Sequence, residues 1–154
     1  MNPTRTRPPQ TAPEIRRLGV ADYDAILSLW QRSGLPSLRP DGRDSRDAFR
    51  RQLERGQIAL GLEESGRLIG CVVATHDTRK GWINRLVIDP VHRRTGYAQQ
   101  LIRAAEEALR EQGMTVMAAL IEDWNTASLK LFQKAGYHVD SDVVYVSKRD
   151  SADS

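Results

Sequence analysis

Residues 86–101 read LVIDPVHRRTGYAQQL, and their pattern determines the expected fold. The apolar start of this stretch ends at Asp89-Pro90, where proline stops strand pairing. Arg93 and Arg94 follow in a short basic loop, and from Gly96 onward the apolar residues repeat with a helical period. The stretch therefore predicts a buried strand, a basic turn and a helix that begins at a glycine.

This turn has the features of an anion site. The first turn of a helix exposes unpaired backbone N–H groups and the positive end of the helix dipole. Gly96 lets an anion approach the backbone closely, and Ala98 keeps the next turn small. With two arginines beside them, these features predict a diphosphate site. Nucleoside triphosphates and dinucleotides are disfavoured as ligands, because the chain has neither a Walker lysine pattern nor a GxGxxG after a strand.

In the rest of the chain, helices alternate with strands in the second half, while the first half contains an antiparallel meander. This order favours a single α/β (α+β) domain over a doubly wound sheet. The domain is expected to span residues 14–148, between a disordered leader (1–13) and a polar tail (149–154). The expected strands are 14–18, 57–63, 67–76, 82–88, 115–121 and 143–147, and the helices begin near residues 22, 45, 96 and 125.

Composition narrows the class of protein. The chain has 154 residues and a formal net charge of +3, which is too weakly basic for a nucleic-acid-binding protein. One cysteine, Cys71, cannot form an internal disulfide framework, so we expect a reducing, cytoplasmic setting. No run approaches the roughly 20 apolar residues that span a bilayer, so no membrane association is expected. The three histidines lie apart without metal-ligand spacing, and no metal is expected.

Two blocks carry a family resemblance. Residues 87–98 resemble the acetyl-CoA motif of the GNAT N-acetyltransferase superfamily, Arg/Gln-x-x-Gly-x-Gly/Ala, with Arg93, Gly96 and Ala98 at the three places. Residues 125–137, from Asn125 through LFQKAGY, are similar to the family's Asn…Ala…Leu-Tyr-x-Lys-x-Gly-Phe helix and turn. The resemblance covers about residues 14–148 and includes the order of the elements.

The resemblance implies a fold and a binding mode for acetyl-CoA. The fold is a mixed, mostly antiparallel central sheet with a splayed strand pair, 82–88 and 115–121, and helices on both faces. Pantetheine would lie between the splayed strands, and the amides of the basic turn would hold the pyrophosphate. The residues expected to bind acetyl-CoA are Leu86, Val87, Ile88, Arg93, Arg94, Thr95, Gly96, Tyr97, Ala98, Asn125 and Phe132.

At the catalytic end the chain departs from the family pattern. Phe132 stands where the family often has a tyrosine that acts as the general acid. Trp82 stands where some members have a glutamate that acts as the base. Glu122 and Asp123 are candidate bases, although a carboxylate pair just past a strand also suits a helix cap. Tyr145 is a candidate acid, although a tyrosine packed against a sheet is an alternative. Water that relays the proton to bulk solvent is a third interpretation.

Trp82 and Asn84 share a strand face with Leu86, so both are candidates for the acceptor pocket, and core packing is the alternative for Trp82. The resemblance implies an acetyl-CoA-dependent N-acetyltransferase that moves the acetyl group to a primary amine directly, in a ternary complex. The alternative is a non-catalytic acyl-CoA-binding or regulatory module. The acceptor is expected to be a small-molecule or peptide amine, and the oligomeric state stays open, with homodimers common in the superfamily.

Overall fold

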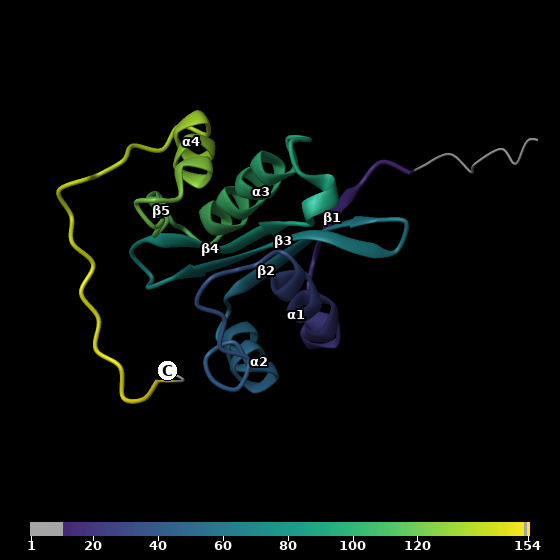
Figure 1. The fold of residues 1–154 in the computed structure, drawn as a ribbon, viewed down its shortest axis with the longest axis horizontal. Coiled ribbons are helices and arrows are strands. Elements are labelled where there is room, and N and C mark those ends of the chain that lie inside the picture. The colour runs from purple at the N-terminus through teal and green to yellow at the C-terminus, as the bar shows by residue number, and fades with distance from the viewer. Residues whose placement is uncertain (1–10, 153) are drawn as a thin grey trace, which may run out of the picture.

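The computed structural model describes residues 11–152 and 154, which form one sheet between two layers of helices (Figure 1). The expected leader, residues 1–13, lies outside this range except for residues 11–13. Within the described part of the chain, no helix is long and apolar enough to cross a bilayer. In chain order the elements are β1 (Glu14–Arg17), η1 (Val20–Asp22), α1 (Tyr23–Arg32), α2 (Arg46–Glu54), β2 (Ile58–Glu64), β3 (Arg67–His76), β4 (Gly81–Ile88), η2 (Pro90–His92), α3 (Tyr97–Glu111), β5 (Met117–Ala118) and α4 (Thr126–Lys134).

The sheet has the order β1-β2-β3-β4-β5, in which the first four strands are antiparallel and β5 runs parallel to β4. β4 and β5 pair only where Gly81 meets Met117 and Trp82 meets Ala118. Beyond these pairs the strands separate, so the edge of β4 from residue 83 to residue 88 has no strand partner on that side within the described ranges. The mixed sheet with a splayed strand pair is therefore confirmed.

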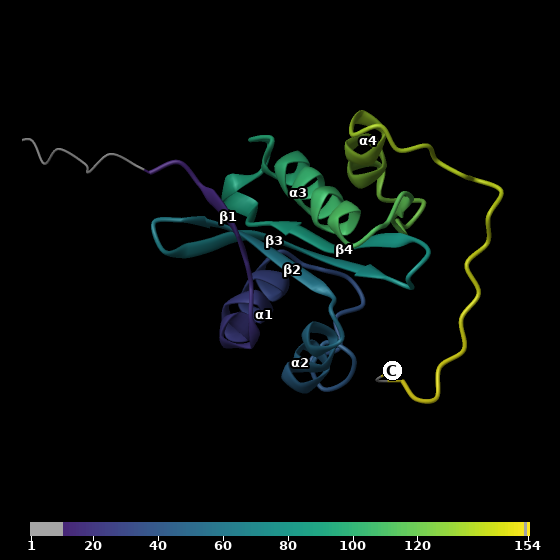
Figure 2. The same ribbon diagram turned by 180° about the vertical axis from the view of Figure 1, so that it is seen from behind.

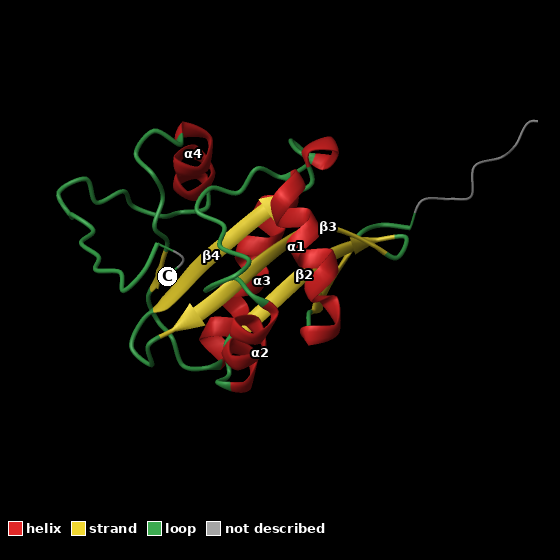
Figure 3. Ribbon diagram, turned by 60° about the horizontal axis from the view of Figure 1, so that its bottom comes forward, coloured by secondary structure: helices red, strands yellow, loops and turns green. Residues whose placement is uncertain are grey.

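Two hydrophobic cores fix the helices on opposite faces of the sheet (Figure 2). α3 packs on one face through a stripe at helical spacing, whose members Leu101, Ile102, Ala105 and Leu109 are fully buried. α1 and α2 cover the other face, as seen from below the sheet in Figure 3. β3, which is apolar almost throughout, contributes to both cores, as expected for an interior strand covered on both sides.

The C-terminal part of the prediction is wrong in two places. β5 has only two residues instead of the expected 115–121, and residues 143–147 form no strand. The segment after α4 stands away from the sheet in both views (Figures 1 and 2), and Tyr145 is 67% exposed. A strand is stable only when it pairs with a neighbour, and the short β5 at the sheet edge offers few groups for pairing. Apolar composition alone therefore did not produce a strand.

Candidate functional site

The turn between β4 and α3 presents a row of free backbone donors. Arg94 and Gly96 have φ angles of 63° and 82°, in the left-handed region, and Gly96 is the N-cap of α3. Among the described residues, no backbone N–H from Arg94 to Gln99 donates to another protein group. The Thr95 hydroxyl donates to the His92 carbonyl oxygen at 2.7 Å and closes the loop onto itself. The turn therefore has the donors that an anion requires.

These donors line a cavity of about 330 Å³, which we call the first cavity. Its wall contains basic side chains from both the turn and α4, and none of its residues is acidic. It therefore fits the diphosphate of a coenzyme in both charge and donor supply. The lining residues are Ile88, His92, Arg93, Arg94, Thr95, Gly96, Tyr97, Ala98, Gln99, Leu131 and Lys134.

Asp89 holds the turn in place from inside the protein. Its carboxylate accepts a hydrogen bond from the Val91 N–H at 3.2 Å and pairs with the Arg32 guanidinium of α1 at 2.9 Å. Burial alone would raise the pKa of Asp89, but the Val91 N–H and the Arg32 guanidinium outweigh burial and lower that pKa below its ordinary value. Asp89 thus ties the start of the turn to the opposite face of the sheet.

Asp89→Asn is expected to lower the free energy of unfolding at pH 7 by about 2 kcal/mol, because it leaves Arg32 without its partner. A lowered folded-state pKa stabilises the protein above the ordinary carboxyl pKa, and this stability is lost as the pH falls through the folded-state pKa. The difference between wild type and variant should therefore shrink on acidification below about pH 4. Urea unfolding at pH 7 and at lower pH measures it, and a difference that grows on acidification would contradict the assignment.

β4 contains a bulge at the point where it has left β5. Cys71 pairs with Val87 and Val73 pairs with Asn84, so Arg85 and Leu86 together face a single residue of β3. Arg85 has a φ of 50°, an uncommon conformation for a residue with a side chain. Bulges redirect side chains and are frequent beside active sites. Here the bulge brings Arg85 to the loop between α1 and α2.

A second cavity, of about 250 Å³, lies beside the bulge on the α1–α2 side of the sheet. It is lined by Trp30, Arg43, Asp44, Phe49, Gln52, Val73, Thr75, Asn84 and Arg85. Asp44 is 7% exposed, and its carboxylate pairs with the Arg85 guanidinium at 2.8 Å. The Asn84 amide donates to the Thr75 hydroxyl at 2.8 Å. β4 thus contributes to both cavities, Ile88 to the first and Asn84 to the second.

Only some of the residues expected to bind acetyl-CoA line the first cavity. Ile88 and all six residues from Arg93 to Ala98 line the first cavity, whereas Leu86 and Val87 lie on the free part of β4. The Asn125 side chain accepts a hydrogen bond from the Ser128 N–H at 3.2 Å, as the N-cap of α4. Phe132 is buried in the core against Tyr137, and its neighbour Leu131 lines the first cavity instead.

The candidates for the acceptor end are scattered. Trp82 is half-buried, and the Lys80 ammonium nitrogen lies over its ring, 5.6 Å from the ring centre. Trp82 does not line the second cavity. Glu122 is exposed between β5 and α4. Tyr145 was expected on a final strand, and that placement is wrong because its segment is unpaired and exposed. Arg43, Asp44 and Arg85 were missed as site residues, because loop and bulge positions carry no periodic signal in the sequence.

Comparison with known proteins identifies the class that this fold and site define. A model described as the Acetyltransferase (GNAT) family matches residues 23–137. The chain is also similar to an acetyltransferase of Sodalis glossinidius, 26% identical over 88% of this chain and 94% of that protein. An acetyltransferase of Pectobacterium atrosepticum is 28% identical over the same shares. The chain therefore belongs to the Acetyltransferase (GNAT) family.

Solved structures share the fold at low sequence identity. An aminoglycoside acetyltransferase in complex with a bisubstrate analogue of CoA has a TM-score of 0.74 at 19% identity, over 90% of this chain and 99% of that chain. The PaiA N-acetyltransferase of Thermoplasma acidophilum, in complex with coenzyme A, has a TM-score of 0.74 at 18% identity, over 84% and 92%. The expected fold is confirmed by these likenesses, and the expectation of an N-acetyltransferase is confirmed by the match to the GNAT family and by the acetyltransferase relatives.

Proposed function

We propose that acetyl-CoA binds with its pyrophosphate on the backbone amides from Arg94 to Gln99 and its pantetheine along the free edge of β4. The observation that carries this proposal is the row of free N–H groups in a cavity without an acidic side chain. Arg93 and Lys134 add positive charge at the same cavity. The thioester would then lie near the bulge of β4, where the second cavity begins.

The chemistry that follows is direct transfer in a ternary complex. A neutral primary amine in the second cavity attacks the thioester carbonyl carbon, so that a C–N bond forms and the C–S bond breaks. The electron pair leaves on the CoA sulfur. A backbone N–H at Leu86 or Val87, beside the bulge, would donate to the carbonyl oxygen as negative charge develops on it. Holding the two substrates together supplies a large part of the rate enhancement.

The amine proton passes to solvent in this proposal. Among the described residues that line the second cavity, Asp44 is the only carboxylate, and it is engaged by the Arg85 guanidinium and by the Arg39 N–H, both at 2.8 Å. Both contacts fall on one oxygen of the carboxylate and hold it in the cavity wall. The leaving thiolate needs no acid, because thiolates are stable anions at moderate pH. Phe132 in place of a tyrosine is compatible with this route.

Glu122→Gln tests whether a side-chain base is used. If solvent takes the proton, kcat should change by less than about threefold, whereas a positioned general base contributes roughly 100-fold or more. Steady-state rates of thiol release measure the change. Glu107→Gln, at an exposed position of α3, is the matched control. A 100-fold loss in the Glu122 variant alone would establish Glu122 as the base and overturn solvent release.

The second candidate function is a non-catalytic acyl-CoA-binding or regulatory module, which is favoured because Asp44, the only carboxylate on the described wall of the second cavity, is ion-paired with Arg85. An amine panel separates the two functions. Release of CoA thiol above the hydrolysis background with any primary amine supports the enzyme. Tight acetyl-CoA binding in calorimetry, with no thiol release from any amine, would support the module instead.

A further inference from the structure

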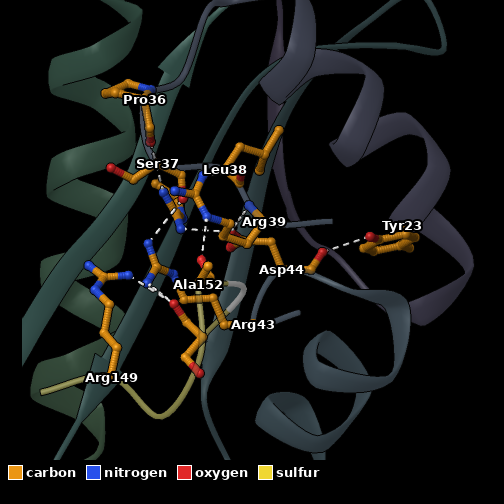
Figure 4. Close-up of polar contacts among 11 residues, drawn as sticks. Tyr23, Pro36, Ser37, Leu38, Arg39, Arg43, Asp44, Arg149 and Ala152 are labelled. Atoms are coloured by element: carbon orange, nitrogen blue, oxygen red, sulfur yellow. Dashed lines mark hydrogen bonds and ion pairs between the residues drawn. The ribbon is translucent and has the colours of Figure 1, made fainter. Parts of the chain in front are cut away.

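Guanidinium groups from separate parts of the chain gather beside the second cavity, and Figure 4 shows those of Arg39, Arg43 and Arg149 close to one another. Arg85 comes from the bulge of β4, and Arg39 and Arg43 come from the loop between α1 and α2. Arg149 reaches the same place from the C-terminal segment. Arg43 and Arg85 line the cavity itself.

Asp44 cannot balance this charge. Its carboxylate pairs with Arg85, and the backbone N–H of Arg39 uses the same oxygen. The two terminal nitrogens of Arg43 donate to main-chain oxygens, that of Ser154 at 2.8 Å and that of Ser37 at 3.0 Å. The wall of the cavity therefore keeps a net positive charge after the Arg85–Asp44 ion pair is taken into account.

The crowding has an electrostatic consequence. Burial lowers the pKa of the Arg43 side chain below its ordinary value, and the neighbouring guanidinium groups, led by that of Arg149, lower it further. Like charges held together in a partly buried site repel one another, and a bound anion removes that repulsion. The site is therefore built at an electrostatic cost that an anionic ligand offsets.

Guanidinium groups bind oxygen close to this cavity. The Ser154 main-chain oxygen accepts hydrogen bonds from Arg43 and from Arg149, both at 2.8 Å. Guanidinium groups match carboxylates in geometry and charge, so a carboxylate is the anion that suits Arg43 and Arg85 in the cavity wall. A cavity of about 250 Å³ suits an acceptor about the size of an amino acid.

We propose that the acceptor amine bears a carboxylate, and that Arg43 and Arg85 bind that carboxylate in the second cavity. This inference rests on the proposed acetyltransferase function. A carboxylate held by these two guanidinium groups would leave the amine near the bulge of β4. Polyamines and aminoglycosides are poor acceptors in this account, because their several ammonium groups would face guanidinium groups of like charge.

The test is thiol release from acetyl-CoA with two matched acceptor sets, free amino acids and the same amino acids as carboxamides. The carboxylate set is expected to contain acceptors whose kcat/KM exceeds that of their amides by about tenfold or more, mainly through KM. Spermidine and an aminoglycoside should be acetylated more slowly than the best amino acid. This comparison uses the wild-type chain and does not depend on any variant folding.

Arg43→Gln should then lower kcat/KM for the carboxylate acceptor by about tenfold while changing that of its amide by less than twofold. Arg51→Gln, at an exposed position of α2, is the matched control and should behave as wild type. Thiol release that favours amides or polyamines, or an equal loss on both acceptors in the Arg43 variant, overturns this inference alone. Acetyl-CoA binding without thiol release from any amine overturns the proposed function and this inference with it.

Discussion

Gly96→Glu is expected to abolish acetyl-CoA binding, with an affinity at least about 100-fold weaker than that of wild type. Gly96 has a φ of 82°, which residues with a Cβ atom rarely adopt. No atom lies within 4 Å of the position that an added Cβ would take. The new side chain would therefore point into the open first cavity. Its carboxylate would place negative charge where the pyrophosphate is proposed to lie. Isothermal titration calorimetry measures the affinity.

Gly66→Glu is the matched control for this substitution. Gly66 has a φ of 77°, and an added Cβ there also meets nothing within 4 Å, but the residue belongs to the β2–β3 hairpin. It carries the same backbone strain and the same charge, and it lines neither cavity. The control should bind acetyl-CoA as wild type does. Equal affinities in the two variants would show that the glycine at the start of α3 has no role in binding.

Leu109→Ala is expected to lower the free energy of unfolding by about 2–5 kcal/mol. The Leu109 side chain is fully buried, and its methyl groups lie against Gly81 of β4. Truncation leaves a cavity in the core between α3 and the sheet, which the backbone of neither element can fill. Urea unfolding monitored by circular dichroism measures the loss.

Leu120→Ala is the control for the core prediction, because Leu120 is 61% exposed just after β5. Its loss should stay within about 0.5 kcal/mol. Similar losses in the two variants would mean that residues 115–121 are buried in solution, and the short β5 described here would then be wrong. The pair thus tests both the core and the edge of the sheet.

The predictions from sequence were accurate wherever one local signal decides the structure. The 3.6-residue period placed α3, and the glycine at its start and the two arginines before it line the first cavity. Ser45 and Asn125 were correct starting points for α2 and α4, because each caps its helix through its own side chain. Such features depend on neighbours within a few residues.

The acceptor side could not be predicted, because its contacts depend on the fold as a whole. Arg85 and Asp44 lie 41 positions apart, and they meet only because a bulge turns Arg85 toward the α1–α2 loop. The predicted strand that contains Tyr145 is wrong for a related reason. Its apolar pattern is typical of a strand, but the segment pairs with no other strand among the described residues. Long-range pairing decided both outcomes, and neither has a local signature.

The central claim, that the turn between β4 and α3 holds the coenzyme's pyrophosphate, is tested most directly by titrating CoA into ¹⁵N-labelled protein and following the backbone amide signals. The amides from Arg94 to Gln99, which are free of protein partners, should show the largest shifts, with further shifts along β4 from residue 83 to residue 88. Amides of the β2–β3 hairpin should not move. Binding that leaves the signals of Arg94 to Gln99 unchanged would contradict the claim.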